Sequence, residues 1–238
     1  MDITVRQFEE DNKDLIEYWL DHALYKPTSN VQDRIPKKVD ANCPRSFRRF
    51  AVLRRQVQLL RQLDLTKSRR VIDIGAGFGD FAMIAKYYNF EQFDATDPSM
   101  PQYNFLTKYM KDYYHNIFDL GIEDIDLQDY DTAILAGVHL PNYRIALEKY
   151  IFNTNIHTLV IRKSFLNIKN VTEVSIDPIE PSPWRYNKEA EWTAIGENFL
   201  NSIMRSRGFI QSSKLELQQS KYVSGNNNSR YIIQYTKK

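Results

Sequence analysis

The sequence predicts an α/β fold, doubly wound around a mostly parallel β-sheet. Three observations support this prediction. From residue 70 onward, short apolar segments typical of buried strands alternate with helical segments, as βαβ units require. Three of the eight glycines cluster directly after the first of these strands. Near the end of the chain, residues 213–223 and 229–236 alternate in polarity around turn residues and predict an antiparallel hairpin.

The segment before the first strand predicts two helices and an irregular connection. Residues 8–24 predict a short helix, and three prolines within 26–45 favour an irregular path. A second helix begins near Ser46, where apolar residues recur every three or four positions. The length of 238 residues fits one α/β domain. We therefore divide the chain into an N-terminal helical or irregular extension, 1–45, and an α/β domain, 46–238.

The expected strands and helices follow from apolar periodicity and from the turn residues between periodic segments. Right-handed crossovers between parallel strands place helices on both faces of the sheet. In chain order we expect strand 70–74, turn 75–79, helix 80–88, strand 91–97, helix 101–114, strand 115–118, strand 131–137, helix 142–153, strand 157–163 and helix 188–207.

The rhythm breaks at residues 167–187, which contain three prolines and have no clear period. A loop this long inside a compact domain is typical either of a functional segment, such as a lid, or of a disordered one. Trp184, Arg185 and Tyr186 lie in it and are candidates for contact with a substrate. The alternative interpretation is a loop that one aromatic side chain anchors to the domain.

The most informative segment is VIDIGAGFGD, residues 71–80, in which a buried strand turns into a helix. Glycines at such a turn tolerate positive φ and let a ligand approach the backbone. The dinucleotide fingerprint G-x-G-x-x-G would need its third glycine at residue 80, but Asp80 stands there, and a carboxylate repels a pyrophosphate. The observed spacing is D-x-G-x-G-x-G from Asp73, and this acidic lead suits a ligand with a positive amino group.

This motif resembles the first motif of the class I S-adenosylmethionine-dependent methyltransferases. The resemblance covers about residues 47–237 and implies their Rossmann-like fold, a seven-stranded sheet with a C-terminal antiparallel hairpin. It also implies S-adenosylmethionine as the cofactor. In the family, Gly75, Gly77 and Gly79 would form the turn under the methionine portion, and Asp73 would lie at its amino-acid end.

Further cofactor contacts follow from the same resemblance. The family places an acidic residue at the end of the second strand, where its two oxygens accept hydrogen bonds from both ribose hydroxyls. Asp97 stands there, and Asp94 is the alternative. The family pattern also places Asp119 and Leu120 near the adenine, and Ala136 beside the cofactor at the end of the fourth strand.

Methyl transfer needs an aligned acceptor and, for most acceptors, a group that removes a proton. His139 follows the fourth strand, and its ordinary pKa near neutrality makes it the candidate general base. A histidine with no catalytic role is the alternative, and His115 is a second candidate base. The sequence after the fourth strand, AGVHLPN, lacks the motif of amino-methylating DNA enzymes, and no Pro-Cys nucleophile occurs. We predict no metal site.

Composition narrows the protein class. Cys43 is the single cysteine, so neither an intramolecular disulfide nor a cysteine-cluster zinc site is possible. No apolar run is long enough to span a bilayer, and the first residues do not resemble a signal peptide. We therefore expect a cytoplasmic protein without a membrane partner.

The segment 34–70 contains twelve Lys and Arg residues and two acidic residues, although the net charge of the chain is only +2. It could bind phosphates, or its cations could pair with acids such as Asp124, Asp126 and Asp129. We expect a small-molecule acceptor, such as a sugar or a phosphorylated metabolite. The alternatives are an RNA or DNA methyltransferase and a non-catalytic S-adenosylmethionine-binding protein. In the nucleic-acid alternative, the docking residues would be Arg45, Arg48, Arg49, Arg54 and Arg55.

Overall fold

The computed structural model describes most of the chain, and the fold is presented for the described residues only. Among them, no helix has both the length and the apolar character needed to cross a membrane. The described residues are 3–22, 45–135, 143–164, 173–176, 192–217 and 230–238.

A seven-stranded sheet forms the centre of the molecule, in the order β3-β2-β1-β4-β5-β9-β8. Strands β1 to β5 run parallel, whereas β9 lies antiparallel between β5 and β8. This order confirms the predicted mostly parallel sheet with a C-terminal hairpin. The strands are β1 Arg70–Ile74, β2 Gln92–Thr96, β3 Ile117–Phe118, β4 Thr132–Leu135, β5 Thr158–Ser164, β8 Phe209–Leu217 and β9 Arg230–Lys237.

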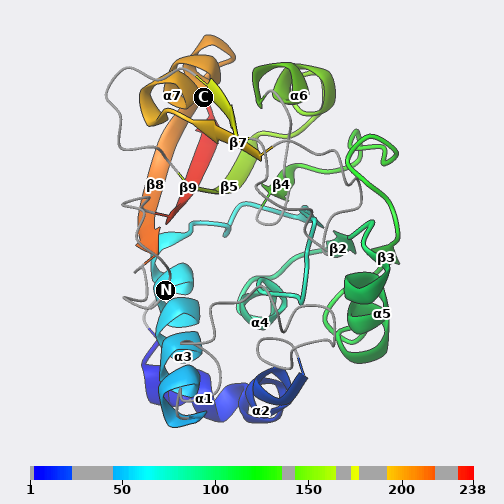
Figure 1. Cartoon of the computed structure of the whole chain (residues 1–238), viewed down its shortest axis with the longest axis vertical. Helices are drawn as coiled ribbons and strands as arrows, with labels where there is room; N and C mark the ends of the chain where they lie inside the picture. The colour runs from blue at the N-terminus through cyan, green and yellow to red at the C-terminus, as the bar shows by residue number, and fades with distance from the viewer. Residues whose placement is uncertain (1–2, 23–44, 136–142, 165–172, 177–191, 218–229) are drawn as a thin grey trace.

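Helices cover both faces of the sheet (Figure 1). One face carries α3, α4 and α5, with α1 and α2 packed against α3, and the other face carries α6 and α7. Each face has its own cluster of buried apolar side chains. The helices are α1 Val5–Asp11, α2 Lys13–His22, α3 Arg45–Gln62, α4 Ala82–Ala85, α5 Met100–Tyr109, α6 Tyr143–Tyr150 and α7 Glu197–Ser206.

The N-terminal residues contribute to the main core. Phe8 and Ile16 are fully buried in the same apolar cluster as Leu60 of α3. The predicted single helix over 8–24 is instead two helices, because the Asn12 side chain donates a hydrogen bond to the Phe8 carbonyl oxygen at 2.8 Å and interrupts the helix between α1 and α2. The division at residue 45 remains a prediction.

Two predicted helices on the α4–α5 face are shorter than expected. After the glycine turn, regular helix is confined to α4. The residues beside it form tight turns instead, for example the turn closed by the hydrogen bond from Ala82 N to Gly79 O at 3.1 Å. The helix predicted over 101–114 ends at Tyr109. Both segments still pack against the sheet.

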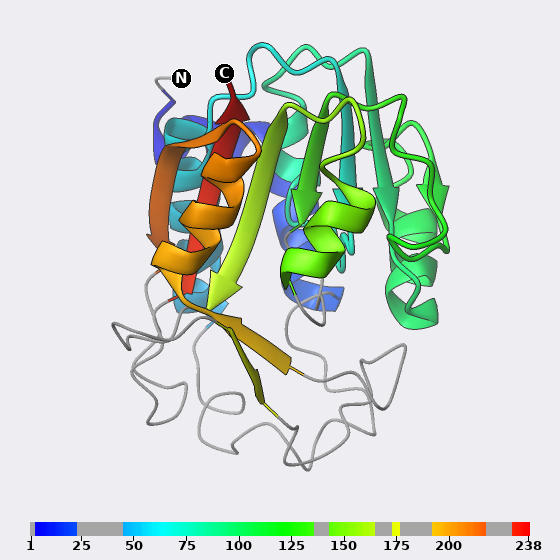
Figure 2. The ribbon, with the colours of Figure 1, turned by 90° about the horizontal axis from the view of Figure 1, so that it is seen from above.

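The prediction of a helix over 188–207 is wrong in its first part. Strand β7, Trp192–Ile195, precedes α7, and it pairs antiparallel with β6, Glu173–Ile176, as a separate two-stranded ribbon. Pairing with a segment some twenty residues earlier overrides the local helix preference. Strand β6 falls inside the predicted lid 167–187, whose other residues lie outside the described part of the chain. Figure 2 shows the ribbon beyond the carboxyl end of β5.

Candidate functional site

The glycine turn lies at the carboxyl end of β1, and its backbone matches the sequence prediction. Gly75, Gly77 and Gly79 have φ of 65°, 61° and 75°, a region that favours glycine. A Cβ added at Gly77 would have no atom within 4 Å, whereas one at Gly79 would lie 3.3 Å from a side-chain carbon of Met110. Gly79 is therefore needed for packing against α5, and Gly77 borders open space.

Asp97 follows β2, and its carboxylate is fixed against the turn. One oxygen accepts a hydrogen bond from the Gly77 amide at 2.8 Å, and the other accepts one from the Ser99 amide at 2.9 Å. Burial raises the pKa of Asp97, while these two amide bonds lower it. Each carboxylate oxygen has a second lone pair, so both can still accept a hydroxyl proton from a ligand.

Asp73 is completely buried in β1, on the sheet face covered by α3 and α4. Its Oδ2 accepts a hydrogen bond from the Tyr114 hydroxyl at 3.0 Å. Its Oδ1 has no hydrogen-bond partner among the described residues. Burial raises the pKa of Asp73 to about 8, although the Tyr114 bond lowers it. A cation placed beside Oδ1 would stabilise the ionised carboxylate.

Asp80, at the other end of the turn, is held by two arginines. Arg55 of α3 lies 3.0 Å from one carboxylate oxygen, and Arg162 of β5 lies 3.2 Å from the other. Because two guanidinium groups offset this carboxylate, its charge is a weaker barrier to an anion than the sequence suggested. These ion pairs join α3, the turn and β5, and no local pattern in the sequence predicts them.

Comparisons with known proteins find relatives by structure alone. No protein-family profile and no curated protein sequence matches the chain. Magnesium protoporphyrin IX methyltransferase from Synechocystis PCC 6803, solved with bound S-adenosylmethionine, is 15% identical over 96% of this chain and 97% of its own, with a TM-score of 0.55. The N-terminal domain of EvdMO1 with bound S-adenosylhomocysteine is 10% identical over 99% and 97%, with a TM-score of 0.57.

A third similar structure extends this likeness. The 1,6-didemethyltoxoflavin-N1-methyltransferase from Burkholderia thailandensis is 12% identical over all of this chain and 92% of its own, with a TM-score of 0.53. The chain has the class I methyltransferase fold. At these identities the likeness establishes the fold, and the activity is argued separately below.

The remaining predicted contacts of this methyltransferase fold lie at the same end of the sheet or outside the described residues. Asp119 is exposed after β3, and Leu120 is half-buried, with its carbonyl oxygen accepting a hydrogen bond from Thr96 at the end of β2. Ala136 and His139 lie outside the described residues, directly after the buried Leu135 that ends β4.

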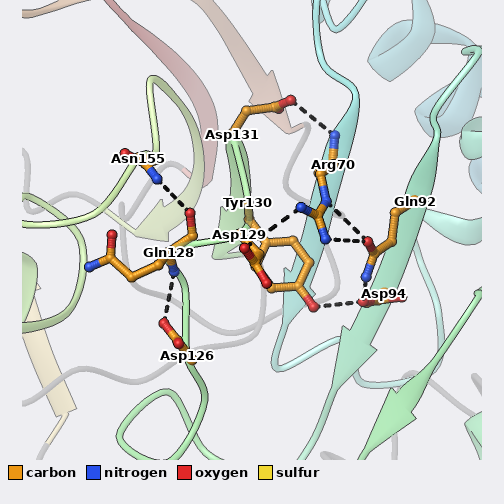
Figure 3. Close-up of polar contacts among 9 residues, drawn as sticks. All are labelled: Arg70, Gln92, Asp94, Asp126, Gln128, Asp129, Tyr130, Asp131 and Asn155. Atoms are coloured by element: carbon orange, nitrogen blue, oxygen red, sulfur yellow. Dashed lines mark hydrogen bonds and ion pairs between the residues drawn. The ribbon is translucent and has the colours of Figure 1, made fainter.

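Asp94 and His115 belong to the opposite end of the sheet. The Asp94 carboxylate accepts hydrogen bonds from the Tyr130 hydroxyl at 2.6 Å and from Gln92 (Figure 3). It also accepts one from the Asn116 side chain. The Nδ1 of His115 accepts a hydrogen bond from the Phe93 amide at 2.9 Å, near the start of β2. Neither residue reaches the glycine turn, so the alternatives that used Asp94 for the ribose and His115 as a base are wrong.

Several arginines in the described part of the basic segment form ion pairs. Arg49 contacts Glu9 and Glu17 of the N-terminal helices, and Arg55 contacts Asp80. These partners differ from the acids expected from the sequence, whereas Arg70, at the end of the segment, lies 3.7 Å from Asp129, which is one of those acids (Figure 3). Arg54 is exposed, while the side chains of Arg45 and Arg48 lie outside the described part. Pairing lowers the positive charge that α3 presents to a polyanion.

Sequence reasoning missed Gln56 of α3. This side chain is fully buried, and its Nε2 donates a hydrogen bond to the Asp80 carbonyl oxygen at 2.9 Å. Its position between the buried Leu53 and Leu60 was the available signal, since a lone amide in an apolar helix face needs a partner. Among the described residues, no group of three or more His, Cys, Asp or Glu side chains could hold a metal ion.

Proposed function

We propose that this chain binds S-adenosylmethionine at the carboxyl end of the sheet and transfers its methyl group to a small-molecule acceptor. The observation that carries the proposal is the bond between Asp97 and the Gly77 amide, which fixes a carboxylate beside a glycine turn that borders open space. A carboxylate there suits the vicinal hydroxyls of a ribose. The fold also supports the proposal, because ligands of open α/β sheets bind at this end.

The proposed contacts divide the cofactor among separate elements. Asp73 would receive the amino group, and the turn over residues 75–79 would lie under the methionine portion. Asp97 would bind the ribose. The adenine would lie near Asp119 and Leu120, and Ala136 would border the cofactor after β4.

The chemistry requires little beyond alignment and proton removal. The acceptor atom attacks the methyl carbon of the sulfonium, the carbon–sulfur bond breaks, and its electron pair stays on sulfur to give S-adenosylhomocysteine. We propose His139 as the base that takes the acceptor proton, because it follows β4 at the reactive end of the sheet.

A small acceptor fits the described surface better than a nucleic acid does. The Arg49 and Arg55 side chains form ion pairs with acidic neighbours, so α3 presents less positive charge for binding phosphates. The names of two similar structures specify a porphyrin and a toxoflavin precursor as their substrates. We propose a sugar or a phosphorylated metabolite as the acceptor, which would bind near the β6–β7 ribbon, beyond the carboxyl end of β5 (Figure 2).

Calorimetric titration with S-adenosylmethionine and S-adenosylhomocysteine tests the proposal. We expect micromolar binding that Asp97→Ala weakens about 100-fold, because two charge-assisted hydrogen bonds to the ribose contribute about 3 kcal/mol. Asp124→Ala, which removes an exposed acid after β3, serves as the control with the same change in charge. Thermal unfolding checks that both variants fold. Absence of binding by the folded wild type would contradict the proposed function.

A second arm separates the remaining alternatives. If His139→Ala binds the cofactor normally and abolishes transfer to an identified acceptor, the chain is an enzyme that uses this base. If the variant keeps the full biological activity of the wild type, a non-catalytic role is supported. Binding to nucleic acid that falls steeply with salt would favour the RNA or DNA alternative.

A further inference from the structure

Gln56 carries a buried hydrogen-bond acceptor that the fold does not use. Its side chain is fully buried, and its Oε1 has no hydrogen-bond partner among the described residues. An unmet buried acceptor costs about 1–3 kcal/mol, which an apolar side chain of similar shape would avoid. The nitrogen of this amide binds the Asp80 carbonyl oxygen, so its oxygen is the atom left for a further partner.

The orientation of this amide is fixed by its neighbour. The Asp80 backbone oxygen can only accept a hydrogen bond, so the nitrogen of Gln56 must face it, at 2.9 Å. The oxygen of the same amide is consequently the free atom. The two atoms of an amide are about 2 Å apart, so Oε1 lies beside the end of the glycine turn.

A second unmet acceptor lies at the other end of the same turn. Asp73 is fully buried, and its Oδ1 has no partner among the described residues. Asp73 and Asp80 are close enough for their charges to interact. One acceptor thus comes from α3 and one from β1, and both flank a turn whose middle glycine borders open space.

The matching ligand group is a compact cation with several N–H donors. Acceptors alone can satisfy such a group, and a primary ammonium has three donors. A hydroxyl would satisfy one oxygen only, and an ionised carboxylate or phosphate has no donor to offer to either oxygen. Resting on the function proposed above, we propose that Gln56 is a cofactor-positioning residue whose Oε1 accepts a hydrogen bond from the ammonium of the cofactor's amino-acid portion, together with Asp73.

This role couples the N-terminal helices to the cofactor. Gln56 lies on the helix that also packs against α1 and α2, while Asp73 lies on the sheet. An ammonium bound by both residues would join α3 to β1 through the ligand. The residues of the glycine motif alone do not provide this connection.

The test compares two ligands that differ only in the amino-acid portion. S-adenosylhomocysteine has the ammonium, whereas methylthioadenosine keeps the adenosine and the thioether without it. We expect Gln56→Met to weaken the binding of S-adenosylhomocysteine about tenfold or more, as for the loss of a hydrogen bond to a charged group. The affinity for methylthioadenosine should change less than about twofold. Gln62→Met, the same change at an exposed position of α3, is the matched control and should alter neither affinity.

Each other outcome has a definite meaning. Equal losses for both ligands, or no change in either, would overturn the role of Gln56 while leaving the proposed function intact. Failure of the wild type to bind either ligand would instead contradict the proposed function. If Gln56→Met does not fold, the crystal structure of the wild type with S-adenosylhomocysteine decides, since an amino nitrogen beyond about 3.5 Å from Oε1 would refute the proposal.

Discussion

The two ends of the central sheet differ in whether the buried carboxylates of their strands are fully paired. At the amino ends of the strands, Asp94 accepts hydrogen bonds from three neighbouring side chains, two of which, Gln92 and Tyr130, are drawn in Figure 3. The half-buried Asp131 accepts from the Arg69 and Arg70 amides at 2.9 and 3.0 Å. At the carboxyl ends, Asp73 has an oxygen without a partner. Buried polar groups are normally paired, so this unmet oxygen is a candidate contact for a ligand.

The pairing at the amino ends also aligns the strands. Arg70 of β1 donates to Gln92 of β2 at 3.0 and 3.1 Å, and Asp131 joins the start of β4 to β1. These bonds support the register in which Val71 pairs with both neighbours. The amino ends therefore act as the structural side of the sheet.

Removing Asp94 gives the largest expected loss of stability. Asp94→Ala would leave the Tyr130 hydroxyl and the Asn116 amide without their acceptor, and we expect the free energy of unfolding to fall by about 3 kcal/mol. Urea unfolding measures this, with Asp126→Ala, an exposed acid that caps a turn, as the control. S-adenosylmethionine affinity should not change. A loss of S-adenosylmethionine affinity together with the loss of stability would contradict the separation of a structural end and a ligand-binding end of the sheet.

Asp73 should impose a pH dependence on stability. The folded chain keeps the Asp73 proton up to pH about 8, whereas the unfolded chain releases it near its ordinary pKa of 3.8. Between these values the folded state binds more protons, so the free energy of unfolding falls as pH rises, by at most about 1.4 kcal/mol per pH unit. Asp73→Asn should reduce this slope in urea unfolding from pH 5 to about 8. An unchanged slope would show that Asp73 is ionised in the folded state.

Replacement of Gly77 and of Gly79, two of the three glycines of the turn, should differ by a smaller amount in its effect on stability. Gly77→Ala and Gly79→Ala each place a side chain at positive φ, which costs about 1–2 kcal/mol. Gly79→Ala should cost about 1 kcal/mol more, because its Cβ crowds Met110. Thermal unfolding compares the pair. Gly77→Ala should lower the free energy of cofactor binding more than it lowers the free energy of unfolding. Equal effects of both variants on these two quantities would argue against open space at Gly77.

The sequence predicted the parallel strands well because each is a short buried run between turn residues. The glycine spacing located the turn, and Asp97 was placed by its position after β2. The β6–β7 ribbon was not predictable from local pattern, because β7 depends on pairing with distant residues. Gln56 and the partners of Asp80 were missed for a similar reason, since both depend on how α3 lies across the turn.

The position of β9 affects how the chain can fold while it is being synthesised. Residues 230–237 follow β8 in the chain, yet they occupy the place between β5 and β8. Until the ribosome has released this segment, β5 lacks one neighbour, and β8 has no partner in the described sheet. Exposed strand edges of this kind favour association with other chains. The nascent chain can therefore order the parallel strands that carry the glycine turn early, but the sheet is complete only after β9 has paired with β5 and β8.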